Sequence, residues 1–376
     1  MAAHLSPIVR WRNYIRWKHL QRRSPLFGII CSMKPIKAYS PAELSQLLAE
    51  EGQPSFRTKQ LLEWLYVHPV RTYDEMTNLP AQLRSRLFEI APLTQTEIIE
   101  RLDSKDGSSK YLLRLYDGNV VECVAIPSSG SRDRLTLCLS SQVGCAMACR
   151  FCATGAEGFN RNLLLGEMVD QVNVIQQDLG LRVSNIVVMG QGEPFLNYEN
   201  TMGALRIIND PKGIAIGARK ITISTCGILS GITRLSKEPE QFTLAISLHS
   251  ARQEVRNELM PHVASYPLGD LRRAIIAYIE ETNRRVTFEY LLLDGINDSQ
   301  KDLDALMAFC NGLLCHVNIL PMNPVQGSPY QPSPQKIVNK WIEALETAGI
   351  STTLRTSRGS DIQGACGQLK NPKCFT

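Results

Sequence analysis

The sequence predicts an α/β fold in which helices cover a parallel sheet, preceded by a small helical domain and a β meander. Two observations lead to this prediction. From residue 135 onward, short apolar runs alternate with helical segments, which is typical of a parallel sheet built from βα units. Before that point, apolar residues recur at helical spacing and then give way to strand-like runs separated by Asp-Gly turns. The predicted parts are a leader over 1–36, a helical domain over 37–92, a meander that links or extends the sheet over 93–130, and the main domain over 131–376.

The leader is strongly basic. It holds seven Lys or Arg residues up to Lys34, and the first acidic residue of the chain is Glu43. Three explanations are open: a disordered basic arm that touches nucleic acid, an organelle transit peptide, or a start-site artefact with Met33 as the real start. Its serine content is low for a transit peptide, so we favour the arm or the artefact. The remaining 35–376 hold 34 basic and 36 acidic residues, so any nucleic-acid affinity there needs local basic patches.

Composition limits the class of protein. A hydrophobic content of 44% is ordinary for a globular protein, and no run of 18 apolar residues suggests a membrane span. Eleven cysteines in 376 residues are too dilute for a secreted disulfide scaffold, and their clustering suggests metal or redox chemistry in a reducing compartment. We therefore expect a cytoplasmic protein without a membrane partner, with import into an organelle through the leader as the alternative.

The helical domain and the meander follow the leader. Apolar spacing predicts helices over 42–48 and 58–66, and Pro80 begins a third that runs to Leu87. Basic side chains on these segments form either a nucleic-acid patch or a solvated helix face. They are Arg57, Lys59, Arg84 and Arg86. In the meander, Glu122 lies inside the apolar run Asn119–Ile126, where an unpaired carboxylate is costly, so it is either on an exposed strand face or a functional acid.

The main domain is predicted from alternating strands and helices. The predicted strands are Leu135–Leu139, Asn185–Met189, Lys220–Ser224, Thr243–Ser247, Val286–Leu292, Val317–Leu320 and Thr352–Leu354. The predicted helices include Leu165–Gln177, Tyr198–Ile208, Leu268–Glu281, Ser299–Phe309 and Pro334–Ala348. A polar segment follows each of the first six strands. Because the carboxyl ends of parallel strands face one side, these segments should converge on one site.

The first of these segments holds three cysteines. Cys145, Cys149 and Cys152 are spaced C-x3-C-x2-C. Thiolates at such spacing hold iron–sulfur clusters, and three ligands for a four-iron cube leave one iron open to a substrate. A redox pair, or a zinc site with a distant fourth ligand, is the alternative for a C-x2-C pair. The added x3 gap favours the cluster.

The cysteine spacing resembles that of the radical S-adenosylmethionine (radical SAM) enzymes. Three further segments make the sequence similar to the RlmN type of dual-specificity RNA methyltransferase over roughly residues 40 to 370. They are Leu137–Gly144, Gly158–Asn162 and Gly364–Leu369. This resemblance implies a partial (β/α)6 radical SAM barrel, a 4Fe–4S cluster on the three cysteines, and S-adenosylmethionine (SAM) as cofactor. It also implies that the helical domain contacts RNA.

The resemblance also implies roles for particular residues. Gly190–Pro194 matches the family's GEP motif, although a glycine-rich segment alone would more often be a tight turn. The implied SAM-binding residues are Gly192, Glu193, Ser224, Ser247, Leu248, His249 and Asn323. Gln191 stands where some relatives of the family have methionine, so the matching contact does not follow from the resemblance. His249 by itself would more often be a structural histidine. The implied catalytic residues are Cys366, Cys138 and Glu122. Without the resemblance, either cysteine would be interpreted as a small buried apolar residue.

The implied activity is methylation of carbon 2 of adenine in 23S rRNA and tRNA, through a methylated Cys366 and two SAM molecules per turnover. Glu122 would remove a proton and Cys138 would form a disulfide with Cys366. We expect an electron donor such as flavodoxin or ferredoxin, and a monomer. Three alternatives remain: a carbon-8 adenine methyltransferase of the antibiotic-resistance branch, a radical SAM enzyme with a non-RNA substrate, and a non-enzymatic iron–sulfur RNA-binding module.

Overall fold

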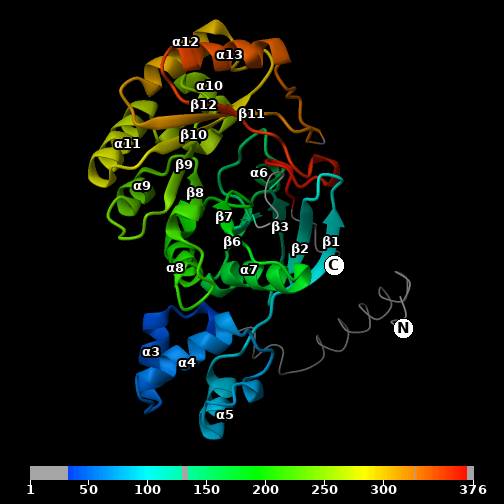
Figure 1. Ribbon diagram of the computed structural model, residues 1–376, viewed down its shortest axis with the longest axis vertical. Helices are drawn as coiled ribbons and strands as arrows, with labels where there is room; N and C mark the ends of the chain where they lie inside the picture. The colour runs from blue at the N-terminus through cyan, green and yellow to red at the C-terminus, as the bar shows by residue number, and fades with distance from the viewer. Residues whose placement is uncertain (1–32, 129–133, 326, 371–376) are drawn as a thin grey trace. The chain divides into compact units, whose positions relative to one another are not determined.

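The computed structural model describes residues 33–128, 134–325 and 327–370 (Figure 1). Most of the predicted leader therefore lies outside the described residues. The chain divides into two compact units, one ending at Thr94 and the other beginning at Gln95. No helix in the described ranges has the length and apolar character that crossing a membrane requires.

The first unit is helical, as its apolar spacing predicts. It contains α3 (Pro41–Glu50), α4 (Phe56–Leu62) and α5 (Ala81–Ile90). A π-helical turn over Glu63–Val67 extends α4, so the predicted helix over 58–66 is continuous but changes its hydrogen bonding. Ser40 begins α3 with a reciprocal capping box to Glu43. The apolar faces of these helices are buried, and their least exposed leucines are Leu44, Leu48, Leu61, Leu65 and Leu87.

Three of the four basic residues predicted as a patch have partners within this unit. Arg57 donates to the Asn78 carbonyl at 2.8 Å, and Arg84 donates to the Asp74 carbonyl at 2.6 Å. Arg86 forms an ion pair with Glu51 at 3.0 Å. These contacts use hydrogen-bond donors that phosphate would otherwise take. An RNA-binding role for this patch therefore stays a prediction.

The second unit is built on one ten-stranded sheet in the order β1-β2-β3-β4-β7-β8-β9-β10-β11-β12. The strands are β1 (Glu97–Asp103), β2 (Ser109–Arg114), β3 (Val120–Pro127), β4 (Leu135–Cys138), β7 (Asn185–Val188), β8 (Ile221–Thr225), β9 (Thr243–Ser247), β10 (Val286–Leu292), β11 (Cys315–Pro321) and β12 (Thr352–Leu354). From β4 to β12 every neighbouring pair is parallel. The predicted parallel sheet is confirmed.

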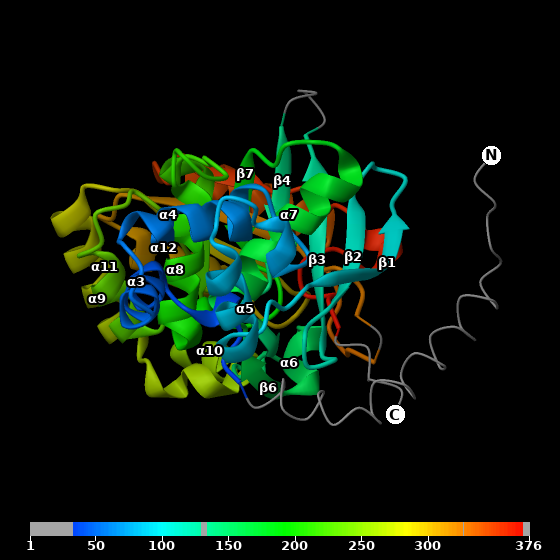
Figure 2. The ribbon, with the colours of Figure 1, turned by 90° about the horizontal axis from the view of Figure 1, so that it is seen from below.

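The meander joins this sheet directly. Strands β1, β2 and β3 pair antiparallel and lie side by side at one end of it (Figure 2). Strand β3 then pairs antiparallel with β4, with Val124 opposite Cys138. The meander is thus part of the main sheet. This register places the strand that carries Glu122 beside the strand that carries Cys138.

Helices connect the parallel strands. The predicted long helices are present as α7 (Leu165–Leu179), α8 (Tyr198–Asn209), α11 (Leu268–Thr282), α12 (Gln300–Cys310) and α13 (Gln335–Thr347). The sequence analysis missed the shorter α6 (Ala153–Glu157), α9 (Leu229–Leu235) and α10 (Gln253–Leu259), and the small ribbon of β5 (Gln142–Gly144) and β6 (Phe159–Asn162). These elements have at most seven residues, too few for a clear hydrophobic period. The βα alternation forms the expected partial barrel.

One large aromatic contact fixes α13 on the sheet. Trp341 is 1% exposed, its ring centroid lies 5.2 Å from that of Tyr290 on β10, and its indole N–H donates to the Asp298 carbonyl at 3.2 Å. Trp341 therefore combines the burial of a large apolar ring with a satisfied donor.

We predict that Trp341→Ala lowers the free energy of unfolding by about 3–5 kcal/mol, because it removes a buried ring and leaves a cavity. Trp341→Phe should cost less, since most of the ring volume remains. Urea denaturation followed by circular dichroism would measure both. A loss below about 1 kcal/mol for the alanine variant would show that α13 packs loosely here.

Candidate active site

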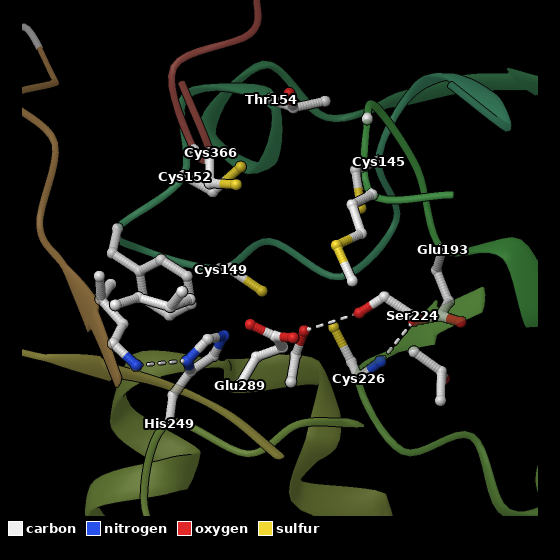
Figure 3. Close-up of a pocket in the computed structure, with 18 of the residues that line it drawn as sticks. Cys145, Cys149, Cys152, Thr154, Glu193, Ser224, Cys226, His249, Glu289 and Cys366 are labelled. Atoms are coloured by element: carbon white, nitrogen blue, oxygen red, sulfur yellow. Dashed lines mark hydrogen bonds between the residues drawn. The ribbon is translucent and has the colours of Figure 1, made fainter. Parts of the chain in front are cut away.

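The carboxyl ends of the parallel strands surround a cavity of about 150 Å³ (Figure 3). Residues of the cysteine segment line one side of it, and residues from the ends of β7 to β11 line the others. Arg355, next to the last residue of β12, completes the wall together with Cys366 and Gly367. The predicted convergence of polar segments on one site is therefore observed.

All three cysteines of the C-x3-C-x2-C segment line this cavity. Backbone bonds hold the segment: the Cys145 N–H donates to the Gly158 carbonyl at 2.9 Å, and the Arg150 N–H donates to the Leu259 carbonyl at 2.9 Å. Gly144, just before the segment, has a φ of +76°, and a Cβ there would lie 2.0 Å from the Gly158 oxygen. Only glycine therefore lets the segment turn at this point.

The chemistry of the three thiols fits a four-iron cluster. No group of three His, Cys, Asp or Glu side chains within the described ranges converges to hold a single metal ion. A 4Fe–4S cluster requires a different arrangement, because each thiolate binds a different iron and the sulfurs surround the cluster. Burial raises the pKa of Cys145 and of Cys152, so these thiols gain from a metal that replaces their protons. The residues present therefore fit the cluster.

Glu193 also lines the cavity, in the segment after β7. It is 2% exposed, and its carboxylate accepts the Cys226 N–H at 2.7 Å and the Phe195 N–H at 3.0 Å. Burial raises its pKa. Gly192 has a φ of +105°, and a Cβ there would touch the Gln142 side chain at 2.6 Å. Glycine thus lets the segment pack on β5, which directs a buried carboxylate into the cavity as an acceptor for an ammonium group.

His249 follows β9 and has a φ of 54°, which is uncommon for a residue with a side chain. Its Nδ1 accepts the Leu291 N–H at 3.0 Å, and its ring packs edge-on against Phe151 at 4.8 Å. The Nδ1 is therefore an acceptor and the proton lies on Nε2. Burial, with the nearby Arg256 charge, lowers the pKa of His249 to about 3, so the ring is neutral at physiological pH.

The other predicted SAM-binding residues divide into two groups. Ser224 and Ser247 line the cavity, and their hydroxyl oxygens are 3.4 Å apart. Leu248 and Asn323 do not belong to the cavity lining. Leu248 is fully buried, and Asn323 instead donates through Nδ2 to the Cys366 carbonyl at 3.2 Å. Asn323 therefore supports the segment that carries Cys366.

Cys366 is exposed and lines the cavity near the cluster cysteines. Its loop, Gln363–Lys370, is hereafter the Cys366 loop. The Ala153 N–H, directly after Cys152, donates to the Gly367 carbonyl at 2.8 Å. The Thr154 hydroxyl donates to the Leu369 carbonyl at 2.7 Å. The cluster segment and the Cys366 loop are thus bonded to each other although about 215 residues separate them in sequence.

Cys138 is buried at the end of β4 and lies outside the cavity lining. Burial raises its pKa to about 12, and the next cause is the neighbouring Cys366. The Arg355 guanidinium opposes this by favouring the Cys138 thiolate. The two cysteines predicted to act together therefore interact electrostatically, with one cation near both.

Glu122 is 4% exposed on β3, also outside the cavity lining. Burial raises its pKa, against the opposing effect of the Lys110 ammonium at 3.1 Å. Its backbone N–H donates to the side-chain oxygen of Gln191 at 2.9 Å. Gln191, in the segment after β7, is thus bonded to the backbone of β3. Of the two interpretations of Glu122, the exposed strand face is wrong.

Sequence analysis missed several residues of the cavity wall, among them an ion pair and a further thiol. Arg355 donates to Glu289 at 3.3 Å, and both line the cavity. Cys226, to which we assigned no role from the sequence, also lines the cavity, and the neighbouring Cys149 thiol and burial raise its pKa. Its position directly after the Ser224-Thr225 strand end was the available signal for Cys226. For Arg355 and Glu289, the only sequence signal for a place in the cavity was their position on or near predicted strands.

Two family models and many individual proteins match this chain. The radical SAM superfamily model matches residues 139–307, and the model described as the ribosomal RNA large subunit methyltransferase N-terminal domain matches residues 36–93. A probable dual-specificity RNA methyltransferase RlmN from Symbiobacterium thermophilum is 44% identical over 343 residues, covering 90% of this chain and 91% of the relative. One of the same description from Clostridioides difficile is 43% identical over 336 residues, covering 89% and 97%.

A solved structure has the same fold along most of the chain. The crystal structure of a radical SAM methyltransferase from Sphaerobacter thermophilus superposes with a TM-score of 0.81 at 42% identity. The match covers 89% of this chain and 99% of the other.

We predict that His249 makes the protein less stable in acid. Its folded pKa of about 3 lies below the ordinary value of 6.5, so its contribution is complete above pH 6.5 and is lost as pH falls toward 3. Between pH 7 and pH 5 the loss from this residue should be about 2 kcal/mol. Urea denaturation at both pH values should show a smaller loss for His249→Gln, while His68→Gln, at an exposed position, should behave as wild type. Equal losses in all three proteins would contradict a neutral buried His249.

Proposed function

The chain belongs to the RlmN family of dual-specificity RNA methyltransferases within the radical SAM superfamily, and from that membership we propose which residues carry out its reaction. It methylates carbon 2 of adenine in ribosomal and transfer RNA, and it uses a 4Fe–4S cluster and SAM. The carbon-8 alternative is not favoured. The observation that best supports our residue assignment is the pair of hydrogen bonds that hold the Cys366 loop on the cluster segment.

The substrate explains why a thiol must carry the methyl group. Carbon 2 of adenine lies between two ring nitrogens and is electron-poor, so it cannot attack the methyl group of a sulfonium. A cysteine thiolate can, because it is a good nucleophile. When bound, the cluster supplies the electron that cleaves SAM and so provides for hydrogen abstraction from an unactivated methyl group. Cys366, at the edge of the cavity, is the thiol that we assign as methyl carrier.

The cavity residues divide the work of binding. Cys145, Cys149 and Cys152 would hold the cluster, supplying three of the four ligands that a four-iron cube needs. The Glu193 carboxylate accepts the ammonium group of SAM, in place of one of its present backbone donors. Ser224 and Ser247 supply hydroxyl groups at the next two strand ends, and neutral His249 offers its Nε2–H without adding a positive charge beside a sulfonium. Leu248 and Asn323 lie outside the cavity lining. Leu248 packs in the core, and Asn323 supports Cys366 through its hydrogen bond to the Cys366 carbonyl.

The remaining steps use three residues in turn. Once methyl-derived carbon joins Cys366 to carbon 2 of adenine, Glu122 accepts the carbon-2 proton. The Cys138 thiolate then attacks the Cys366 sulfur, the sulfur–carbon bond breaks, and its electron pair takes a proton to complete the new methyl group. A Cys138–Cys366 disulfide remains. The adduct also gives up its one unpaired electron when it loses the carbon-2 proton, and this electron replaces the one used to cleave SAM. The disulfide is then the oxidised product that balances the net two-electron reduction of the second SAM to methionine and 5′-deoxyadenosine. A thiol reductant must then restore both cysteines.

On the same basis we propose a role for each domain and name the partners of the enzyme. Residues 37–92 contact the RNA, the meander over 93–130 supplies Glu122, and residues 131–376 hold the cluster, SAM and Cys366. A small electron-transfer protein such as flavodoxin or ferredoxin reduces the cluster. The enzyme works as a monomer. The match of residues 36–93 to a methyltransferase N-terminal domain supports the first of these assignments.

We predict that Cys149→Ala removes the cluster while the chain stays folded. Anaerobic reconstitution should load about four irons per wild-type chain and close to none in the variant, because two thiolates cannot hold a cube. Cys310→Ala is the matched control, since this buried cysteine lies outside the cavity lining. Normal iron content in Cys149→Ala would exclude the C-x3-C-x2-C segment as the cluster site.

We predict that alanine substitution of Cys366 and of Cys138 stops the reaction at different steps. Cys366→Ala should give no methylated RNA and no RNA–protein adduct, because the methyl carrier is lost. Cys138→Ala should accumulate a covalent adduct, because the thiol that releases the RNA is missing. Denaturing gel electrophoresis with labelled RNA, followed by RNase treatment, would detect the adduct. Turnover by Cys366→Ala, or release of product at the wild-type rate by Cys138→Ala, would contradict these roles.

A further inference from the structure

A buried ion pair lies next to the Cys366 loop. The Lys110 ammonium on β2 is 3.1 Å from the Glu122 carboxylate on β3, and the two side chains are 8% and 5% exposed. Lys110 stands opposite Val124 and Glu122 stands opposite Leu112 in the antiparallel register, so the two residues are diagonal neighbours on one face of the sheet. The pair is thus built into the meander where it adjoins β4.

Both members of the pair also contact the Cys366 loop. The other Glu122 oxygen accepts the Lys370 backbone N–H at 2.8 Å. The Lys110 ammonium contacts the Gln363 carbonyl at 3.4 Å. Gln363 and Lys370 are the two ends of the loop, with Cys366 between them. One ion pair therefore holds both ends of the segment that carries the methyl group.

Other titratable groups near Glu122 do not replace Lys110. Glu157, at the end of α6, carries a like charge that opposes ionisation of Glu122. Cys123, the next residue on β3, is a fully buried thiol. Lys370 contributes its backbone N–H to the carboxylate. Lys110 is the cation that favours the carboxylate form of this buried group.

We propose that Lys110 is a positioning residue that keeps Glu122 ionised, and that the Lys110–Glu122 pair is a latch for the Cys366 loop which opens when Glu122 accepts the carbon-2 proton. This proposal rests on the role assigned to Glu122 under the proposed function. The proton leaves carbon 2 and binds the carboxylate, which becomes a neutral carboxylic acid.

The latch gives the reaction an order. A neutral acid accepts weaker hydrogen bonds than a carboxylate, so proton transfer weakens the bonds to Lys110 and to the Lys370 N–H together. The ends of the loop therefore lose their bonds to the meander at the moment when Cys366 must turn toward Cys138 for disulfide formation. Before proton transfer, the charged latch holds both ends of the Cys366 loop on the meander, while the Ala153 and Thr154 bonds hold the loop on the cluster segment. Release of the RNA would thus follow removal of the carbon-2 proton.

The first test is the pH dependence of single-turnover product formation by Lys110→Met. Without the cation, buried Glu122 should stay protonated at pH 7, and the loss of a general base should slow formation of 2-methyladenosine by about 100-fold. The rate should recover as the pH is raised, and the RNA–protein adduct should persist at pH 7 and decay at high pH. Lys110→Arg should recover most of the rate. Lys105→Met, at an exposed position near the start of the same strand, should match wild type.

The second test does not depend on RNA. Hydrogen exchange of the backbone amides in 363–370, followed by mass spectrometry, should be faster in Lys110→Met and in Glu122→Gln than in wild type at pH 7, and close to wild type in Lys110→Arg. The double variant Lys110→Met/Glu122→Gln, which has no buried unpaired charge, should show the same fast exchange if the latch itself is responsible. It also controls for misfolding of the single variant.

The outcomes separate the two levels of the proposal. A wild-type enzyme that forms no 2-methyladenosine would overturn the proposed function and leave the exchange test to judge the latch. A pH profile of Lys110→Met that is parallel to wild type would overturn the positioning role of Lys110. Unchanged exchange in all variants would overturn the latch. Slow product formation that recovers with pH, together with fast loop exchange, would support both.

Discussion

The parallel pairing of the strands from β4 to β12 is the constraint on which the rest of the site depends. Parallel strands must all end on the same side of the sheet, so the segments that follow them meet around one cavity. This brings together residues as distant in sequence as Cys145, Glu193, His249 and Arg355. No single segment would form a site alone. The antiparallel meander extends the same sheet, and so it carries Glu122 to the neighbourhood of Cys138.

A second feature is the burial of reactive groups. Low exposure raises the pKa of Cys138, of Glu122 and of two cluster thiols, which opposes their charged forms. Neighbouring cations and metal ions therefore determine which of these buried thiols and carboxyl groups are ionised. Arg355 lies near both catalytic thiols, and Lys110 lies against Glu122.

Much of this arrangement could be predicted from the sequence, for identifiable reasons. The long helices and buried strands have clear hydrophobic periods, and the spacing of Cys145, Cys149 and Cys152 is specific by itself. Resemblance, rather than spacing, pointed to Cys138, Cys366 and Glu122. The diagonal contact between Lys110 and Glu122 could not be predicted, because it depends on the register of β2 and β3. Nor could the position of Asn323, which supports Cys366 from outside the cavity wall, because it depends on the path of the C-terminal loop.

The central claim is that Cys366 carries the methyl group to carbon 2 of adenine, and the fate of deuterium tests it most directly. The enzyme would be incubated with RNA and with SAM that carries three deuterium atoms on its methyl group. The product nucleosides would then be separated by chromatography and their masses measured by mass spectrometry. If Cys366 is the carrier, hydrogen abstraction removes one deuterium before transfer. The account therefore predicts 2-methyladenosine with two deuterium atoms, the third being found in 5′-deoxyadenosine. A product with three deuterium atoms, or label at carbon 8, would contradict it.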